Sequence, residues 1–181
     1  RRPGHGGLPA LRPGLDAVVR KLAVLGSTGS IGTATLDVAA AHPEALSVVA
    51  LAAGRNRDLF LEQVRRWRPA CVSLATHEDV AWLRTVLDYK PEMHWGPEGL
   101  KACALHGGVD TVMAAVVGSA GLDSTEAALR SGHRVCVANK ESLVVGGALM
   151  RRALEAGGGE LLPVDSEHAA LHQLLADRDP A

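Results

Sequence analysis

The stretch from Lys21 to Gly32, KLAVLGSTGSIG, constrains the fold of this chain more than any other. A short apolar run, residues 22–25, is followed at once by glycines at 26, 29 and 32, and then by Ala- and Leu-rich sequence with helical spacing. This order predicts a strand, a Gly-rich turn and a helix. Glycine lets the backbone approach a ligand closely, and a helix N-terminus presents unpaired N–H groups to an anion. We therefore expect the turn to bind a phosphate group.

The glycine spacing alone does not establish nucleotide binding. Gly-x-x-Gly-x-x-Gly is a variant of the dinucleotide fingerprint, and a Gly-rich turn without a ligand is the alternative. The strand before it and the helix after it favour the nucleotide, and Ser27, Thr28 and Ser30 add hydroxyl donors within the same turn.

Strands and helices alternate over short connections from Lys21 onward, which predicts a mainly parallel sheet covered on both faces, the doubly wound α/β fold of Rossmann type. The first helix is expected over residues 30–41, with Ile31, Ala34 and Val38 along its apolar face. Residues 1–20, rich in Arg, Pro and Gly, are expected to form a disordered tail. The expected strands are residues 21–26, 46–53, 71–75, 93–95, 110–117, 134–138 and 161–164.

Composition excludes several classes of partner. A net charge of −1 and a pI near 6.8 give no basic surface for nucleic acid. The longest apolar stretch, residues 112–117, is too short to cross a bilayer. The three cysteines are scattered and no two of them lie at ligand spacing, so the sequence suggests neither a zinc site nor a disulfide framework. We expect a soluble, cytoplasmic protein with no nucleic-acid or membrane partner.

The end of the second strand indicates which dinucleotide is bound. In this fold it faces the adenosine ribose, where an acid favours NAD and a cation favours the 2′-phosphate of NADP. The sequence there, AGRNR over residues 53–57, has no carboxylate before Asp58. Arg55 is the better candidate for the phosphate and Arg57 the reserve. The alternative is that both arginines are merely solvated at a helix start.

Two further motifs follow later strands. Asn139 is suited to cap a helix, and the two residues after it, Lys140 and Glu141, could reach a substrate or suit the helix dipole. Asp165 and Glu167 place two carboxylates at the exit of the last strand. Such oxygen ligands suit Mg²⁺ or Mn²⁺, although two carboxylates make an incomplete site.

Five motifs together resemble one enzyme family closely. They are GSTGSIG at 26–32, AGRN at 53–56, GSAGL at 118–122, ANKESLV at 138–144 and LPVDSEH at 162–168. In this order they are similar to 1-deoxy-D-xylulose 5-phosphate reductoisomerases, and the resemblance spans about residues 21–173. It implies NADPH- and metal-dependent conversion of 1-deoxy-D-xylulose 5-phosphate to 2-C-methyl-D-erythritol 4-phosphate, an early step toward isoprenoid precursors.

The resemblance also implies a role for each matching residue. Cofactor phosphates would contact Thr28, Gly29, Ser30 and Ile31, in the turn bounded by Gly26 and Gly32. The ribose phosphate would contact Gly54, Arg55 and Asn56. The nicotinamide side of the cofactor would contact Asn139 and Glu141. The sugar-phosphate substrate would contact Lys140, Ser166 and Glu167, with Lys140 and Glu167 catalytic. The metal, Mg²⁺ or Mn²⁺, would be held by Asp165 and Glu167.

The same resemblance implies a domain division. Residues 21–164 would form the NADPH-binding domain, and residues 165–181 would begin a metal- and substrate-binding domain that the chain does not complete. A third metal carboxylate, a mobile lid and a C-terminal helical domain are expected in the family beyond Ala181, so the chain is expected to be a fragment without activity alone. The full-length protein is expected to be a homodimer.

Two other functions stay open at this point. One is a stand-alone NADP-binding sensor or partner module, which would not need the carboxylates of the motif at 165–168. The other is an NADP-dependent dehydrogenase of the homoserine or semialdehyde type, which would not be expected to carry ANKESLV at 138–144.

Overall fold

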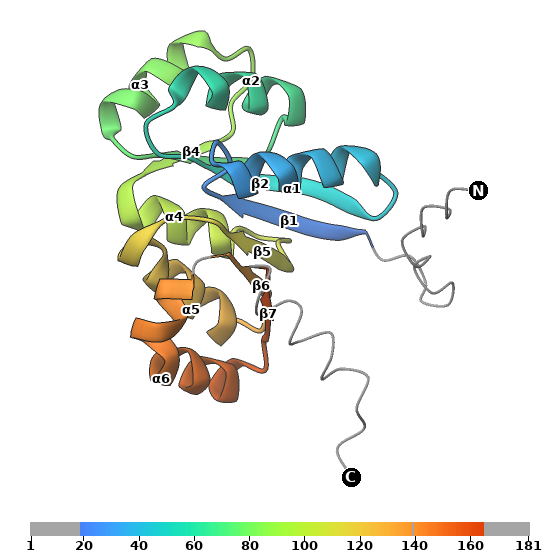
Figure 1. Cartoon of the computed structure of the whole chain (residues 1–181). Coiled ribbons are helices and arrows are strands. Elements are labelled where there is room, and N and C mark those ends of the chain that lie inside the picture. Colours follow the sequence, from blue (N-terminus) through green and yellow to red (C-terminus); the bar gives the residue numbers. More distant parts are fainter. Residues whose placement is uncertain (1–18, 139, 165–181) are drawn as a thin grey trace, which may run out of the picture.

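A single sheet of seven parallel strands forms the centre of the molecule (Figure 1). The computed structural model describes residues 19–138 and 140–164. The strand order is β4-β3-β2-β1-β5-β6-β7. The strands are β1 Arg20–Leu25, β2 Leu46–Ala52, β3 Cys71–Leu74, β4 Glu92–Trp95, β5 Thr111–Ala114, β6 Arg134–Val137 and β7 Glu160–Pro163. The tail expected at the N-terminus, apart from residues 19 and 20, and the expected second domain at 165–181 lie outside the described residues.

Helices cover both faces of the sheet, which confirms the doubly wound α/β prediction. One layer consists of α1 Ser30–Ala41, α2 Arg57–Trp67 and α3 His77–Val86, and the other of α4 Gly96–Leu105, α5 Leu122–Arg130 and α6 Lys140–Gly157. A 3₁₀ turn, η1 Gly118–Gly121, precedes α5. The chain runs outward from β1 to β4 and then returns through α4 to β5, which pairs with the other side of β1. The strand order therefore reverses between β1 and β5, where open α/β sheets bind ligands.

The strands are apolar throughout because both of their faces are covered. In β1, Leu22 and Val24 belong to the core under α1 and α2, whereas Ala23 and Leu25 belong to the core on the opposite face. Side chains alternate across a strand, so a strand buried on both faces reads as a continuous apolar run. This is why the run at 22–25 predicted the central strand correctly.

The apolar face predicted for α1 was wrong. Ile31 and Val38 are 41% and 53% exposed, whereas the helix buries Gly32, Leu36 and Ala39. Both sets have helical spacing, so periodicity could not choose between them. The choice is made by Gly32, which packs against the Gly-rich turn as described below. Ile31 is consequently exposed at the N-terminus of α1.

The strand predicted over residues 110–117 is shorter in the structure. β5 ends at Ala114, opposite the last residue of β1, Leu25. Ala115 still donates its backbone N–H to the Leu25 carbonyl at 2.9 Å, but beyond it β1 has turned away and offers no further ladder partner. Residues 115–117 therefore leave the sheet, and Val117 is 85% exposed. None of the helices in the described part of the chain combines the length and apolar character needed to span a bilayer.

Candidate nucleotide-binding site

The Gly-rich turn lies where the strand order reverses. Its backbone is tied to β2, because the N–H groups of Gly26 and Ser27 both donate to the Ala52 carbonyl, at 2.8 and 2.9 Å. Gly26 has a φ of +86°, and a Cβ there would lie 2.5 Å from the Ala115 carbonyl oxygen. Only glycine satisfies both the left-handed backbone and this close approach.

The other two glycines bring the start of α1 against the turn. Gly29 caps the helix without a side-chain hydrogen bond, and its N–H donates to the Gly26 carbonyl at 3.0 Å. A Cβ on Gly32 would lie 2.3 Å from the same carbonyl oxygen, so the helix reaches its position only with glycine there. The first amides of α1 have no capping side chain. Unpaired amides at a helix N-terminus are suited to an anion.

Ser27 does not offer its hydroxyl to a ligand. It is fully buried, and its Oγ donates to Gln63 Oε1 at 2.7 Å, while Gln63 Nε2 donates to the Ser27 carbonyl at 2.8 Å. Gln63 was not predicted as a residue that supports the turn. Its signal was a polar residue on the buried stripe of α2, between Phe60 and Val64.

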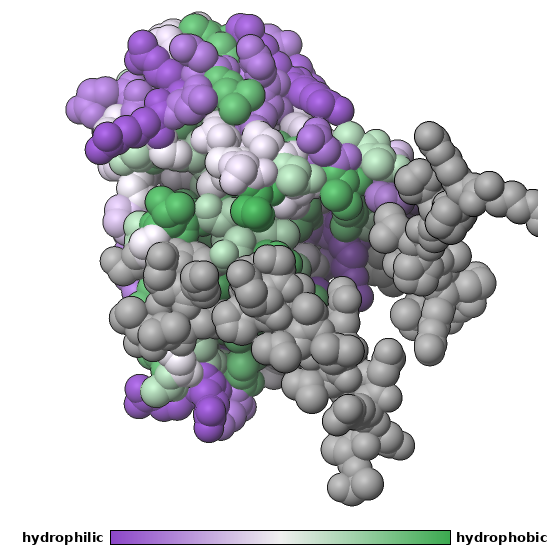
Figure 2. Space-filling view, viewed as in Figure 1, coloured by the Kyte–Doolittle hydropathy of each residue, from purple (hydrophilic) through white to green (hydrophobic). Residues whose placement is uncertain are grey.

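A cavity of about 400 Å³ opens beside the turn, at the carboxyl ends of β1, β2, β3 and β5. Its size falls within the range of small-molecule sites, and small and apolar residues dominate its walls. Figure 2 shows hydrophilic residues concentrated over α2 and α3, and paler and hydrophobic residues across the middle of the same view. The lining residues are Gly26, Thr28, Gly29, Ala53, Gly54, Leu74, Ala75, Gly96, Pro97, Leu100, Ala115, Val116, Val117 and Ala120.

Gly26, Thr28, Gly29 and Gly54 were predicted site residues, and the structure brings them together at this cavity. Ser30 and Ile31 follow as the exposed first residues of α1. The walls from β3, α4 and residues 115–117 were not predicted, because apolar side chains at strand ends look like core in a sequence.

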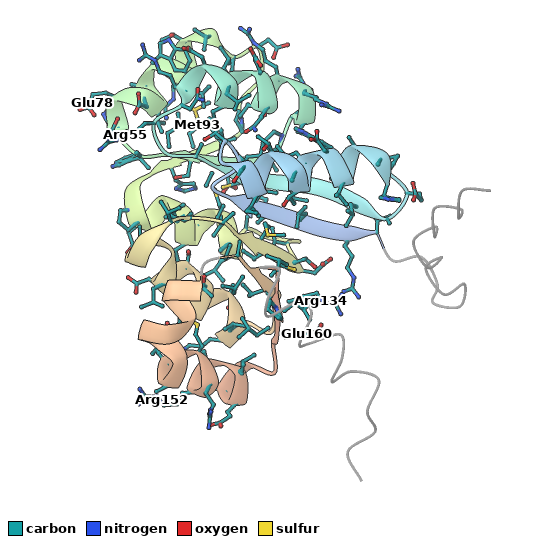
Figure 3. The ribbon with its side chains drawn as sticks, in the orientation of Figure 1. Arg55, Glu78, Met93, Arg134, Arg152 and Glu160 are labelled. Atoms are coloured by element: carbon teal, nitrogen blue, oxygen red, sulfur yellow. The ribbon has the colours of Figure 1, made fainter. Side chains whose placement is uncertain are left out.

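The two arginines after β2 have different surroundings. Arg57 lies 4.8 Å from the centre of the Trp82 ring and 3.9 Å from Asp79 Oδ1. Arg55 is exposed, and across residues 19–138 and 140–164 its guanidinium has no hydrogen bond or ion pair. It projects from the molecule at the same end as Glu78, at the start of α3 (Figure 3). Asn56 caps α2, its Oδ1 accepting from the Leu59 N–H at 3.3 Å.

Comparison with known proteins decides the family. The sequence profile of 1-deoxy-D-xylulose 5-phosphate reductoisomerase matches residues 22–147, from β1 into α6. This chain belongs to the 1-deoxy-D-xylulose 5-phosphate reductoisomerase family. The assignment replaces the alternative of a homoserine- or semialdehyde-type dehydrogenase.

Individual reductoisomerases are similar over most of this chain. The enzyme from Symbiobacterium thermophilum is 49% identical over 164 residues, covering 88% of this chain and 42% of its own length. That from Thermosynechococcus vestitus is 43% identical over 161 residues, covering 87% and 39%. The chain thus spans about two fifths of the length of these relatives.

Solved reductoisomerases have the same fold. The Zymomonas mobilis enzyme in complex with NADPH has a TM-score of 0.81 and 40% identity, covering 86% of this chain and 41% of that one. A reductoisomerase in complex with NADPH, fosmidomycin and magnesium has a TM-score of 0.81 and 39% identity, covering 86% and 38%.

The structure describes only part of the remaining predicted site residues. The backbone of α6 begins at Lys140, directly after β6, and the Ala138 N–H donates to the Ala114 carbonyl at 3.1 Å. The start of α6 therefore lies at the same edge of the sheet as the Gly-rich turn. The side chains of Lys140 and Glu141 lie outside what the structure describes, as do Asn139, Asp165, Ser166 and Glu167 in full.

Proposed function

We propose that this chain is the NADPH-binding part of a reductoisomerase that converts 1-deoxy-D-xylulose 5-phosphate to 2-C-methyl-D-erythritol 4-phosphate. The observation that carries the proposal is the Gly-rich turn against the 400 Å³ cavity, in a chain of this family. The relative from Zymomonas mobilis was solved in complex with NADPH. The proposal includes a cytoplasmic location and a homodimeric full-length enzyme.

The described residues fit the cofactor. Gly26 and Gly32 leave no room for a Cβ, which is the shape expected where backbone must approach a pyrophosphate. Thr28, Gly29, Ser30 and Ile31 would hold the phosphates at the N-terminus of α1. Gly54 and Asn56 would lie beside the adenosine ribose, and Arg55 would pair with its 2′-phosphate. When bound, NADPH supplies the hydride.

The substrate and metal roles rest on the motifs alone. Asp165 and Glu167 are proposed to hold Mg²⁺ or Mn²⁺, and Lys140, Ser166 and Glu167 to bind the sugar phosphate. Asn139 and Glu141 are proposed to lie beside the nicotinamide. When bound, the metal serves as a Lewis acid toward the substrate oxygens.

A fluorescence titration with NADPH and NADH tests the cofactor assignment. We expect the chain to bind NADPH at least about tenfold more tightly than NADH, or about 1.4 kcal/mol. Gly29→Val should abolish binding, because its side chain would occupy the space that the phosphates require. Gly147→Val is the matched control, since Gly147 lies on α6 with open space around its Cα. Equal affinities for the two dinucleotides would contradict the assignment.

Turnover tests the rest of the proposal. The chain alone, mixed with 1-deoxy-D-xylulose 5-phosphate, Mn²⁺ and NADPH, is expected to bind NADPH without oxidising it, because two carboxylates leave a hard cation short of protein ligands. A reductoisomerase extended to the length of the relatives should oxidise NADPH, and Glu167→Gln should stop that reaction. Metal-dependent turnover by the 181-residue chain would overturn the expectation that it is catalytically incomplete.

A further inference from the structure

Three potential metal ligands meet at the edge of the sheet, away from the nucleotide cavity. Cys71 begins β3, and Glu92 and His94 belong to the edge strand β4. One ligand atom from each residue lies within 4.8 Å of the other two. The cavity contains Leu74 and Ala75, at the opposite end of β3. The two sites are therefore separate.

Parallel strand pairing, not sequence spacing, assembles this group. Cys71 pairs with Glu92 and Ser73 with His94. Residues two apart in a strand project to the same face, so His94 joins Glu92 beside Cys71. Met93, between them, packs into the core on the α2 and α3 face (Figure 3). A search for a His close to a Cys in sequence could not find this arrangement, because twenty-two residues lie between Cys71 and His94.

We propose that Cys71, Glu92 and His94 bind a zinc-class divalent cation. Thiolate, imidazole and carboxylate are the usual protein ligands of Zn²⁺, and three of them leave a fourth position for water. A site containing a thiolate selects zinc or a similar soft cation over Mg²⁺ or Mn²⁺. This cation is thus distinct from the one proposed for Asp165 and Glu167.

The distances require only small side-chain movements. Bonds of about 2.0–2.3 Å from zinc to N, O and S place tetrahedral ligand atoms about 3.3–3.8 Å apart. Glu92 Oε2 is already 3.8 Å from His94 Nε2. Cys71 is fully buried, whereas the side chains of Glu92 and His94 are 66% and 40% exposed and can rotate. A cation would therefore reach the thiol from the side of Glu92 and His94.

Two neighbouring residues lie against the proposed ligands. The Cys103 Sγ lies 3.6 Å from the Cys71 Sγ, a hydrogen-bonding distance for sulfur. His106 Nε2 lies 3.8 Å from Glu92 Oε1, the oxygen that is not paired with His94. A small rotation of the exposed Glu92 side chain would bring this oxygen within hydrogen-bond reach of His106, and hydrogen bonds of this kind orient the ligands of established metal sites.

Cobalt titration of the 181-residue chain, kept reduced with a phosphine, tests the proposal. We expect one Co²⁺ per chain, with thiolate-to-cobalt charge-transfer absorption and the intense visible bands of tetrahedral coordination, and displacement of cobalt by Zn²⁺. At a hundredfold excess over Kd, Zn²⁺ should raise the thermal midpoint by about 5–10 °C.

Variants identify the ligands. Cys71→Ser should remove the charge-transfer band, and His94→Gln and Glu92→Gln should each weaken binding at least tenfold. Cys103→Ser should weaken it about tenfold while keeping the band. Cys136→Ser, on β6, and His42→Gln, on the surface after α1, are the matched controls and should bind cobalt as the unaltered chain does.

Three results would overturn the proposal. One is cobalt spectra without a charge-transfer band, which would indicate binding to surface carboxylates. Another is affinity that is unchanged in both His94→Gln and Glu92→Gln; these exposed positions decide the matter if Cys71→Ser fails to fold. The third is a charge-transfer band that persists in Cys71→Ser, which would mean that another cysteine supplies the thiolate.

Discussion

Ser27 and Gln63 are joined by two hydrogen bonds, one in each direction, that tie the Gly-rich turn to α2. The hydroxyl of Ser27 donates at 2.7 Å and the amide of Gln63 donates back at 2.8 Å. Both residues are buried, at 0% and 7% exposure. The turn is therefore held by a residue 36 positions later in the chain.

Gln63→Leu should destabilise the fold and weaken cofactor binding together. It leaves the Ser27 hydroxyl and carbonyl buried without partners, which costs about 1–3 kcal/mol in the free energy of unfolding. Urea unfolding measures that cost, and NADPH titration should show a weaker Kd because the turn loses its support. The exposed neighbour Glu62→Gln should change stability by less than about 0.5 kcal/mol. A Gln63→Leu variant as stable as the parent would show that the pair is dispensable.

Gly29 and Gly32 of the turn should respond differently to alanine. At Gly32 a Cβ meets backbone at 2.3 Å, so Gly32→Ala should cost about 1–3 kcal/mol, as overpacking does. At Gly29 the nearest atom is 3.4 Å away, an ordinary contact, and its φ is −79°. Gly29→Ala should therefore fold with nearly normal stability in urea. Gly147→Ala serves as the control for replacing glycine in an open position. If Gly29→Ala proved the more destabilised variant, the packing account of the turn would be wrong.

Replacing each arginine after β2 should separate specificity from stability. Arg55→Ala should weaken NADPH binding about tenfold and leave NADH binding unchanged, because a charge-assisted contact to the 2′-phosphate is lost. Arg57→Ala should leave the ratio of the two affinities unchanged. It should lower stability by about 0.5–1 kcal/mol, because Arg57 stacks on Trp82. If only Arg57→Ala changed the coenzyme preference, Arg57 and not Arg55 would be the residue that contacts the 2′-phosphate.

Much of the fold could be predicted from the sequence because local signals agree with the tertiary arrangement. The helix 30–41 was placed correctly, since a Gly-rich turn starts it and a Pro43-containing turn follows it. The buried face of this helix was predicted wrongly, because Ala- and Leu-rich helices have apolar residues on more than one side. Only the contact of Gly32 with the turn decides which side is buried. The length of β5 was also predicted wrongly, because β5 ends where its neighbour β1 ends and the sequence of β5 alone does not show this.

The candidate site was predictable where it depends on backbone chemistry. Gly26 occupies a position that requires a close approach, and Gly29 and Gly54 were predicted from their places in the Gly-rich turn and at the end of β2. All three line the cavity. Gln63 and the group around Cys71 were not predicted, because both depend on pairing between distant segments. A polar residue on a buried helical stripe was the one available signal for Gln63.

Tyr89 offers a test of the packing around the segment that follows α2. Its hydroxyl donates to the Pro69 carbonyl at 3.1 Å, and the Arg68 guanidinium lies 4.4 Å from its ring centre. Burial raises the pKa of Tyr89 to about 12. Because the pKa in the folded state exceeds the value of about 10 in the unfolded state, the folded protein holds the phenol proton more tightly. This contribution to stability is fully present below pH 10 and is lost as the pH rises toward 12.

Tyr89 is the only tyrosine in the chain, so the tyrosinate absorbance reports it directly. The absorbance midpoint of the folded protein is expected near pH 12, and that of the protein in urea near about pH 10. The free energy of unfolding of the parent and of Tyr89→Phe should be measured by chemical denaturation at several pH values. The difference between the two should be constant below about pH 10 and should shrink above it. The difference between the two proteins isolates the contribution of the Tyr89 hydroxyl. A folded-state midpoint near 10 would mean that the Tyr89 hydroxyl is solvated, and that its contact with Pro69 does not persist in solution.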